Sequence, residues 1–371
     1  MISFTPMDDA AFSHAVVDWF RANARDLPWR RTYDPYHVWL SEIMAQQTQL
    51  GRVVDYFRRF TARYPDIDSL AQAHEDEALK LWEGLGYYSR CRNLLAAART
   101  VRAEHGGVLP ATLDGLLSLP GIGPYTAGAV MAFAHNAPCT AIDANVERVF
   151  ARVCDLDRPV KHPANQAFIE DRAQALIPEG GARDFNQGLM ELGALVCTPK
   201  NPDCPACPLL AHCRARALGL ERERPVPGKR TDVVKVNVAT GVLAHEGRVY
   251  VQKRRLDDVW PGLWEFPGGG IEAGETPEQA VVREYMEETG VRVEPVASIA
   301  TVRYSYTRFR VTLHGFWLRF VGSFSQPALH EALEGRFLLP AELDSLAFPA
   351  GHRRLIDHLL TDGRRGEFID M

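Results

Sequence analysis

The chain has 371 residues, of which 46% are hydrophobic and 24% charged, and its formal net charge is −5. This length exceeds what one hydrophobic core usually organises, so we expect two domains. The N-terminus lacks a basic segment followed by an apolar run, and no apolar stretch reaches membrane-spanning length without Pro, Gly or charge. We therefore expect a cytoplasmic protein without membrane contact, and we expect a monomer. The acidic balance neither predicts nor excludes nucleic acid as a partner, because binding can depend on local geometry.

The first two hundred residues repeat apolar side chains at helical spacing. The clearest segments are 11–23, 38–60, 76–86, 90–105 and 165–177. The connectors between them contain Pro or Gly, and no strand-like alternation of any length appears. We expect an all-α domain over residues 1–220.

The pattern changes after residue 220. The segment ERERPVPGKR is charged and rich in Pro, which is typical of a linker, and we place this linker at 221–232. Runs rich in β-branched and aromatic residues follow, together with two helical stretches. The runs are 233–245, 248–254, 298–306 and 310–321, and the helical stretches are 277–289 and 351–361. The sequence predicts an α+β domain over 233–371, after the all-α domain.

Four of the seven cysteines lie within seventeen residues, in CTPKNPDCPACPLLAHC. They are Cys197, Cys204, Cys207 and Cys213, with the spacing C-x6-C-x2-C-x5-C. An odd number of cysteines and no export signal argue against a disulfide framework. Four thiolates this close can converge on zinc or on an iron–sulfur cluster. Structural zinc sites usually pair two short Cys-x2-Cys units and only one is present, so the spacing favours the cluster, with zinc as the alternative.

The segment LPGIGPYTAGAV, residues 119–130, places Gly121 and Gly123 before a helical run. Two glycines allow a tight turn between helices, and N–H groups at a helix N-terminus can bind a phosphate. Backbone dipoles of this kind would let an acidic protein bind DNA without added positive charge.

Two carboxyl groups are candidates for catalysis. Asp143 comes just before a helical run, where Asp is also a favoured N-cap that stays ionised. Glu42 lies among Leu40, Ile43 and Met44, and an acid in such an apolar helical setting can have a raised pKa that suits proton donation. Each also has a structural interpretation, as a helix cap and as a surface residue. Cleavage of an N-glycosidic bond needs such a pair, one to protonate the departing base and one to stabilise the oxocarbenium-like sugar.

Six motifs together resemble the MutY adenine DNA glycosylase family of the endonuclease III superfamily. They are residues 27–30, 39–49, 84–90, 119–130, 142–149 and the cysteine loop. The resemblance implies a helix-hairpin-helix glycosylase domain with one 4Fe–4S cluster on the four cysteines. It implies removal of adenine mispaired with 8-oxoguanine or guanine in double-stranded DNA. On the matching positions, Glu42 would act on adenine N7, Asp143 would stabilise the cation, Tyr125 and Asn145 would line the site, and Gln47 and Tyr87 would wedge into the duplex.

Tyr125 separates two related activities. Endonuclease III-like enzymes carry a Lys at this hairpin position, and that Lys forms a Schiff base that permits strand cleavage. Tyrosine cannot, so the resemblance implies a monofunctional glycosylase. Two positions depart from the family pattern: Ala144 replaces the usual Gly, and Ala45 replaces the usual Leu. If position 144 needs a positive φ, Ala144 would be strained.

The second domain contains a complete Nudix box from Gly269 to Val291, in which only Tyr285 departs from the pattern. The segment 262–284 resembles the MutT nucleotide pyrophosphohydrolase. Three acids of the box, Glu284, Glu287 and Glu288, lie at helical spacings of three and four, so one helix face can present them to Mg²⁺. Glu331 aligns with a further metal-binding acid of that enzyme.

Two functions therefore stay open for the second domain. Adenine glycosylases of the family commonly end in a Nudix-like domain that recognises 8-oxoguanine but has lost the box, so lesion recognition is our first expectation. The family's Phe-Ser-His loop appears here as Tyr306, Thr307 and Arg308, which predicts an altered readout. The complete box favours the alternative, a bifunctional protein whose second domain also hydrolyses oxidised nucleoside triphosphates.

Overall fold

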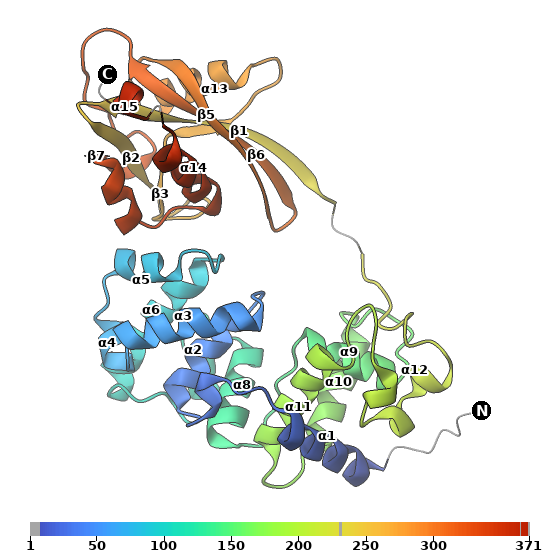
Figure 1. The fold of residues 1–371 in the computed structure, drawn as a ribbon. Helices are drawn as coiled ribbons and strands as arrows, with labels where there is room; N and C mark the ends of the chain where they lie inside the picture. The colour runs from blue at the N-terminus through green and yellow to red at the C-terminus, as the bar shows by residue number, and fades with distance from the viewer. Residues whose placement is uncertain (1–7, 230–231, 364, 370–371) are drawn as a thin grey trace. The chain divides into compact units, whose positions relative to one another are not determined.

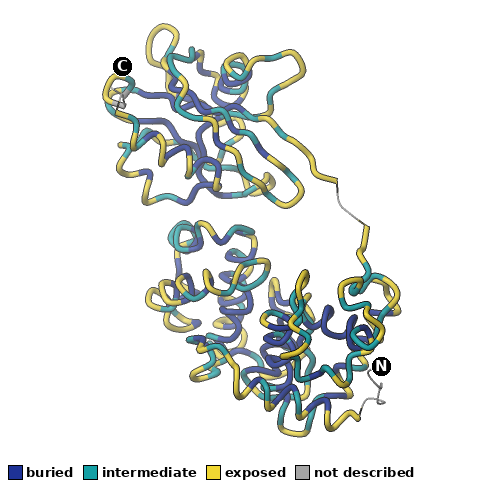
Figure 2. The backbone as a smooth tube through the Cα atoms, turned by 45° about the vertical axis from the view of Figure 1, so that its right-hand side comes forward, coloured by how far each residue is buried: buried dark blue, intermediate teal, exposed yellow. Residues whose placement is uncertain are grey.

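The computed structural model describes residues 8–229, 232–363 and 365–369, which form two compact units (Figure 1). The first unit is Met1–Gln72 with Asn93–Arg230, and the second is Ala73–Arg92 with Thr231–Met371. Figure 2 shows that each unit has its own buried interior. Residues 1–7 of the expected first domain, 230 and 231 of the expected linker, and 364, 370 and 371 lie outside the described part.

The named elements of the first unit are all helices, which confirms the all-α expectation. They are α1 (Asp9–Asn23), η1 (Pro28–Arg30), α2 (Pro35–Ala45), α3 (Leu50–Arg63), α4 (Ile67–Ala71), α6 (Ser89–His105, which begins in the second unit), α7 (Leu113–Leu117), α8 (Pro124–His135), α9 (Ala144–Val153), α10 (Pro163–Ala175), α11 (Ala182–Leu195), η2 (Cys204–Ala206), η3 (Leu210–His212) and α12 (Arg214–Ala217). None of the helices in the described ranges is both long and apolar enough to cross a membrane.

The core beneath the cysteine loop is built from α1, α9, α10 and α11. On α9 the buried residues Val146, Val149, Phe150 and Val153 follow the i, i+3, i+4, i+7 spacing of one helix face. Phe12 from α1 lies fully buried in the same cluster. Each large apolar side chain buried in this way contributes about 1.5–3 kcal/mol, so packing holds this group of helices together.

The helical run expected over 38–60 is interrupted. Helix α2 ends at Ala45 and α3 begins at Leu50, and between them Gln47 has a left-handed φ of 54°. Apolar residues recur at helical spacing on both sides of this break, so the break is not visible in the apolar pattern. It turns the intervening residues towards the cavity described below.

The first residues of the expected linker contact the first unit. Arg224 forms an ion pair with Asp155, and its carbonyl oxygen accepts from Nε of the buried Arg152 at 2.9 Å. Val226 forms an isolated parallel bridge with Pro159. The chain is therefore held to the first unit as far as Val226.

The second unit contains a mixed seven-stranded sheet, which confirms the α+β expectation. The strands are β1 (Val234–His245), β2 (Arg248–Arg254), β3 (Trp264–Glu265), β4 (Gly268–Gly270), β5 (Val293–Tyr306), β6 (Phe309–Phe320) and β7 (Ala332–Leu338). Their order is β3-β2-β1-β6-β5, with β4 paired to β1 and β7 paired to β2. β1 and β6 run parallel, and the other pairs are antiparallel.

Helices cover both faces of this sheet. The Nudix-box helix α13 (Pro277–Thr289) buries Val281 and Tyr285 against one face. Helix α14 (Ala350–Thr361) buries Leu355 and Ile356 against the other, and η4 (Pro340–Ser345) and α15 (Arg365–Ile369) lie beside it in the sequence. Successive side chains of a strand point to opposite faces of the sheet, so they pack alternately into the core under α13 and the core under α14.

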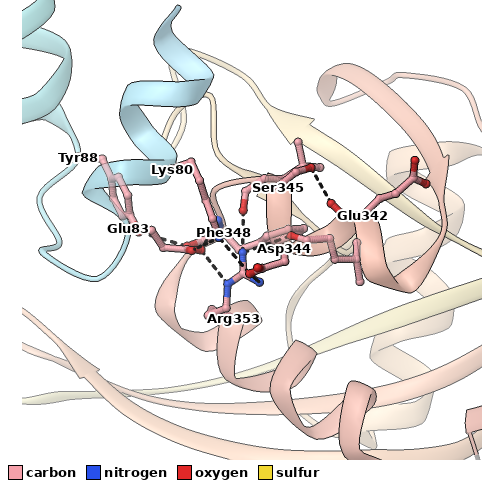
Figure 3. A network of polar contacts seen from close by, with 10 residues as sticks. Lys80, Glu83, Tyr88, Glu342, Asp344, Ser345, Phe348 and Arg353 are labelled. Atoms are coloured by element: carbon pink, nitrogen blue, oxygen red, sulfur yellow. Dashed lines mark hydrogen bonds and ion pairs between the residues drawn. The ribbon is translucent and has the colours of Figure 1, made fainter. Parts of the chain in front are cut away.

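Residues 73–92 belong to the second unit by their contacts, although they interrupt the first in sequence. This segment holds α5 (Glu75–Trp82) and a loop that contacts the segment before α14 (Figure 3). One oxygen of the largely buried Glu83 accepts from the Phe348 N–H and from Arg353 Nε, both at 2.9 Å. The Tyr88 hydroxyl donates to the Phe348 carbonyl at 3.2 Å, and Lys80 donates to the second Glu83 oxygen at 2.6 Å.

The Glu83–Arg353 pair should contribute measurably to stability. Arg353→Met keeps the aliphatic stem but leaves Glu83 with fewer donors, so we expect the free energy of unfolding to fall by about 1–3 kcal/mol. Urea unfolding of the full chain measures this. Arg255→Met is the control, because its ion pair with Asp257 is exposed and should matter by less than about 1 kcal/mol. Equal effects of the two variants would contradict the role of the pair.

Candidate active site

A cavity of about 820 Å³ in the first unit brings five of the expected site residues together. Its lining includes Glu42, Gln47, Tyr125, Asp143 and Asn145. The residues come from α2, α8, α9 and the break after α2, which are separated by up to a hundred positions in sequence. The volume falls within the range of cavities that bind small organic groups, so a nucleobase with its sugar can be accommodated.

Glu42 lies on α2 and is 7% exposed. Burial raises the pKa of its carboxyl from 4.5 to about 7, since a charge is costly where water is excluded. The Tyr125 hydroxyl donates to Glu42 Oε2 at 2.6 Å and lowers this pKa in part, while Asp143 raises it and Arg30 lowers it. The carboxyl group is therefore placed to hold a proton near neutral pH.

Asp143 is the N-cap of α9. Its Oδ1 accepts from the N–H groups of Asn145 and Val146, each at 2.9 Å, and its Oδ2 accepts from Asn145 Nδ2 at 2.6 Å. These donors favour the carboxylate, but burial outweighs them and the pKa of Asp143 is raised rather than lowered. Ala144 does not have the positive φ that would strain it. It is the first residue of α9 and is not among the described non-glycine residues with positive φ.

Arg148 connects Asn145, which donates to Asp143, with the cysteine loop. Its Nη2 donates to Asn145 Oδ1 at 2.7 Å and to the Gly193 carbonyl at 2.8 Å, and its Nε donates to the Cys197 carbonyl at 2.8 Å. A Cβ on Gly193 would lie 2.6 Å from the Asn145 Cβ, so this glycine lets α9 and α11 approach closely. Sequence reasoning missed Arg148, since two of these partners, the Gly193 and Cys197 carbonyls, lie far away along the chain.

The part of the cavity lined by α11 carries buried ion pairs that sequence reasoning also missed. Glu191 on α11 is 1% exposed and accepts from Arg25 at 2.7 and 2.9 Å and from Arg30 at 2.7 Å. Arg30 Nε also donates to Gln187 Oε1 at 2.7 Å. The signal was a single acid within the apolar run of α11, but nothing in the sequence identified its partners.

The expected DNA-contacting residues lie in loops. Gly121 has a φ of 73°, and a Cβ there would lie 2.5 Å from the Asn93 Cβ, so both conformation and space require glycine. Gly123 is the N-cap of α8 and provides no side-chain cap, which leaves the first N–H groups of that helix available. Gln47 lines the cavity at the α2–α3 break, whereas Tyr87, with a φ of 48°, belongs to the second unit.

The four cysteines of the loop line one small cavity together with Arg152. Arg152 is 1% exposed, and its Nη1 lies 3.2 Å from Cys197 Sγ and donates to the Thr198 carbonyl at 2.7 Å. Burial raises the pKa of the Cys207 thiol to about 12 and that of Cys213 to about 11. A buried guanidinium beside these sulfurs suits a centre that carries negative charge.

The acids of the Nudix box gather around Arg283. This side chain donates to Glu275 at 2.8 and 3.0 Å, to Glu284 at 3.0 Å and to Glu287 at 3.0 Å. Burial raises the pKa of Glu284, and repulsion from Glu287 and Glu331 adds to that increase. Glu284 therefore interacts electrostatically with each of the other three expected residues, Glu287, Glu288 and Glu331.

Glu288 lies deeper than the other acids of the box. Its Oε2 accepts from Gln252 Nε2 at 2.6 Å, and burial, followed by repulsion from Glu265, raises its pKa to about 9. Glu265 is itself buried, with a pKa raised to about 7, and was not expected from the sequence. Within the described ranges, no three His, Cys, Asp or Glu side chains are grouped so that they could hold one metal ion.

Comparison with known proteins decides the family. Residues 40–170 match the model of the HhH-GPD superfamily base excision DNA repair protein, and residues 238–358 match that of the NUDIX domain. An adenine DNA glycosylase of Buchnera aphidicola subsp. Schizaphis graminum is 33% identical over 69% of this chain and 74% of its own length. The chain belongs to the adenine DNA glycosylase family. The adenine DNA glycosylase of Homo sapiens is 41% identical over 56% of this chain and 39% of its own.

A solved structure supports the fold of the helical part. A thermostable thymine-DNA glycosylase is similar with a TM-score of 0.53 and 30% identity, over 57% of this chain and 97% of that one. The fold expected for the glycosylase is thereby confirmed. Family membership makes the chain a hydrolase that acts on N-glycosyl bonds of DNA.

The buried acid gives the glycosylase a pH-dependent stability. The pKa of Glu42 is higher in the folded state than in the unfolded state, so between pH 4.5 and 7 the folded state keeps a proton that the unfolded state releases. The free energy of unfolding therefore falls as the pH rises through this window. Glu42→Gln removes this loss. We compare the free energy of unfolding of the variant with that of the wild type at each pH. The difference in favour of the variant should be larger at pH 8 than at pH 4.5 by about 3 kcal/mol, which is an upper estimate from the pKa shift.

Urea unfolding of both proteins at the two pH values measures this difference. The exposed Glu104 provides the control, since Glu104→Gln should change stability by the same small amount at each pH. A stability difference for Glu42→Gln that does not change with pH would refute the raised pKa.

Proposed function

We propose that the glycosylase hydrolyses the N-glycosidic bond of adenine mispaired with 8-oxoguanine or guanine in double-stranded DNA. The observation that carries this proposal is the shared cavity of Glu42 and Asp143, which offers one buried proton donor and one carboxyl group held by donors. Such a pair matches the two demands of glycosidic cleavage. The duplex must release the base into the cavity, at a cost of a few kcal/mol.

The chemistry follows from the two environments. Glu42 transfers its proton to adenine N7, the C1′–N9 bond breaks with its electron pair going to the base, and positive charge develops on the sugar. Asp143 as a carboxylate stabilises that charge, and two backbone N–H groups and Asn145 hold its position. Water then adds at C1′ and loses a proton, which restores the Glu42 carboxyl group.

Tyr125 supports a monofunctional reaction. Its hydroxyl is bonded to Glu42, and burial raises its pKa well above 10, so it is neither a base nor a Schiff-base nucleophile at neutral pH. The residue instead orients the acid and restrains one of its oxygens. The proposal therefore includes base release without strand cleavage.

Recognition of the mispair is assigned to loops of both units. Gln47 and Tyr87 are the proposed wedge residues, and each has a left-handed backbone in its loop. Within the second unit the Tyr87 ring lies 6.0 Å from that of Tyr306, and Tyr306 lies 5.1 Å from Trp260. Aromatic side chains beside a wedge residue suit stacking on a base, which supports a lesion-reading role for the loop at 306–308.

One 4Fe–4S cluster is the proposed cofactor of the cysteine loop. The four thiols share a cavity, and the buried Arg152 beside Cys197 balances negative charge there. The spacing, with a single Cys-x2-Cys unit, favours a cluster, in which each iron takes one thiolate, over a single zinc. The cluster would supply a rigid anchor, and Cys197 would hold Arg148 and through it Asn145.

The test is base release from duplexes that carry adenine opposite 8-oxoguanine, guanine or cytosine. We expect release opposite the first two and no strand cleavage, and we expect Glu42→Gln and Asp143→Asn each to lower the single-turnover rate by at least about 100-fold. Asp171→Asn, at an exposed position of α10, should keep the wild-type rate. Wild-type rates in both catalytic variants would exclude the mechanism, and efficient strand cleavage would exclude the monofunctional assignment.

A second candidate activity is Mg²⁺-dependent hydrolysis of oxidised nucleoside triphosphates by the second unit. Mutual repulsion among Glu284, Glu287, Glu288 and Glu331 favours it, because a divalent cation relieves repulsion of this kind. Arg283 holds Glu275, Glu284 and Glu287, so binding of the cation would require these carboxylates to exchange partners.

Hydrolysis of 8-oxo-dGTP in excess Mg²⁺ tests this second activity. We expect monophosphate and pyrophosphate as products, and at least about a 100-fold loss in Glu287→Gln and in Glu288→Gln. Glu278→Gln, in the exposed first turn of α13, is the matched control. No turnover by the wild type would reject the second activity and leave the glycosylase proposal intact.

A further inference from the structure

The second unit carries a cationic strip, defined here as Lys235 on β1, Arg310 on β6 and Arg303 on β5. These three side chains are exposed and come from three adjacent strands. In the register of the sheet Lys235 pairs with Arg310, and Arg303 pairs with Thr312, two residues further along β6. Residues two apart on a strand share a face, so all three cations lie on one face of the sheet.

The opposite face of the same strands is apolar. Val236, Val311 and Tyr304 form one row there, and Val238, Leu313 and Val302 form the next. Val302 and Leu313 belong to the core under α14, and Val238 and Tyr304 pack against it. The outward direction of the strip is therefore fixed, because a one-residue slip would bury the three charges.

No acid on the three strands lies beside the strip. Glu294 is the only acid on β1, β5 and β6, and it forms an ion pair with Arg319 at the far end of β6. Among the ion pairs of the described residues, none involves Lys235, Arg303 or Arg310. Three unpaired cations in a chain of net charge −5 form a local surface of the opposite sign.

We propose that the cationic strip binds the phosphate backbone of double-stranded DNA. Directly opposed residues lie about 5 Å apart and diagonal ones about 7–8 Å apart, so adjacent phosphates can be contacted together. The strip is continuous with the β5–β6 turn at Thr307 and Arg308, whose neighbour Tyr306 contacts the ring of Tyr87. One hairpin thus combines an aromatic tip with a positively charged stem.

This inference rests on the proposed function for the identity of the polyanion. The other source of phosphate is a nucleotide at the Nudix box, whose loop residues Gly268–Gly270 pair with β1 at Thr240, Ala239 and Val238. Lys235 lies three residues beyond that pairing, or about 10 Å along the strand. A strip of three exposed cations that crosses β1, β6 and β5 suits an extended duplex better than a compact triphosphate.

The salt dependence of DNA binding tests the proposal. Fluorescence anisotropy with an undamaged duplex gives the slope of log K against log[salt], and each lost phosphate contact should reduce its magnitude by about 0.9. We expect Lys235→Gln, Arg303→Gln and Arg310→Gln to reduce the slope singly, and the triple variant to reduce it by 2 to 3 on that estimate. Arg319→Gln is the matched control. Arg319 lies on β6, as Arg310 does, but it forms an ion pair with Glu294, so its loss should leave the slope unchanged.

Three outcomes would overturn the proposal. They are a wild-type slope in the triple variant, an equal reduction by Arg319→Gln, and weaker dGTP binding by the triple variant with unchanged DNA binding. Single-turnover adenine release at saturating enzyme distinguishes failure of the proposed function, because it does not depend on the slope. We expect that rate to be unchanged in Arg319→Gln.

Discussion

The burial of the Glu42 carboxyl group is the constraint on which the rest of the active site depends. A carboxylate shielded from water must either gain strong partners or keep its proton. Tyr125 donates one hydrogen bond to Glu42, and the nearby Arg30 is shared with the buried Glu191 and with Gln187. Stabilisation of the anion is therefore incomplete, and the pKa rises to about 7. The protein is therefore less stable at high pH, but it holds a proton beside the cavity near neutral pH.

Asp143 is held by donors that favour its carboxylate form, although burial still raises its pKa. It is also partly buried, but two N–H groups at the start of α9 and the Asn145 amide direct three donors at its oxygens. Arg148 then connects Asn145 to the backbone of Cys197. The cysteine loop thus does more than close the helical unit, because Arg148 and Asn145 connect it to the Asp143 carboxyl group. A defect in the loop should be felt at Asp143 without any residue of the cavity being changed.

Local patterns in the sequence predict much of this arrangement. Apolar periodicity gives the helices, spacing gives the cysteine loop, and the contrast between an apolar and a capping environment identifies Glu42 and Asp143. Long-range partners were not predictable: Arg148 and the pair Arg30–Glu191 depend on helices that meet only in the fold. The break at Gln47 was missed because apolar residues continue in phase across it. Local sequence also gives no sign that residues 73–92 contact the second unit, since this contact depends on Glu83 meeting Arg353 some 270 positions later.

The central claim is that Glu42 keeps its proton at neutral pH while ordinary carboxyl groups do not. ¹³C NMR titration of side-chain carboxyl groups in glutamate-labelled protein measures this directly, and Glu42→Gln identifies the resonance. The account predicts an apparent pKa close to the value of about 7 set by burial. A Glu42 resonance that titrates near 4.5, as an exposed glutamate does, would contradict it.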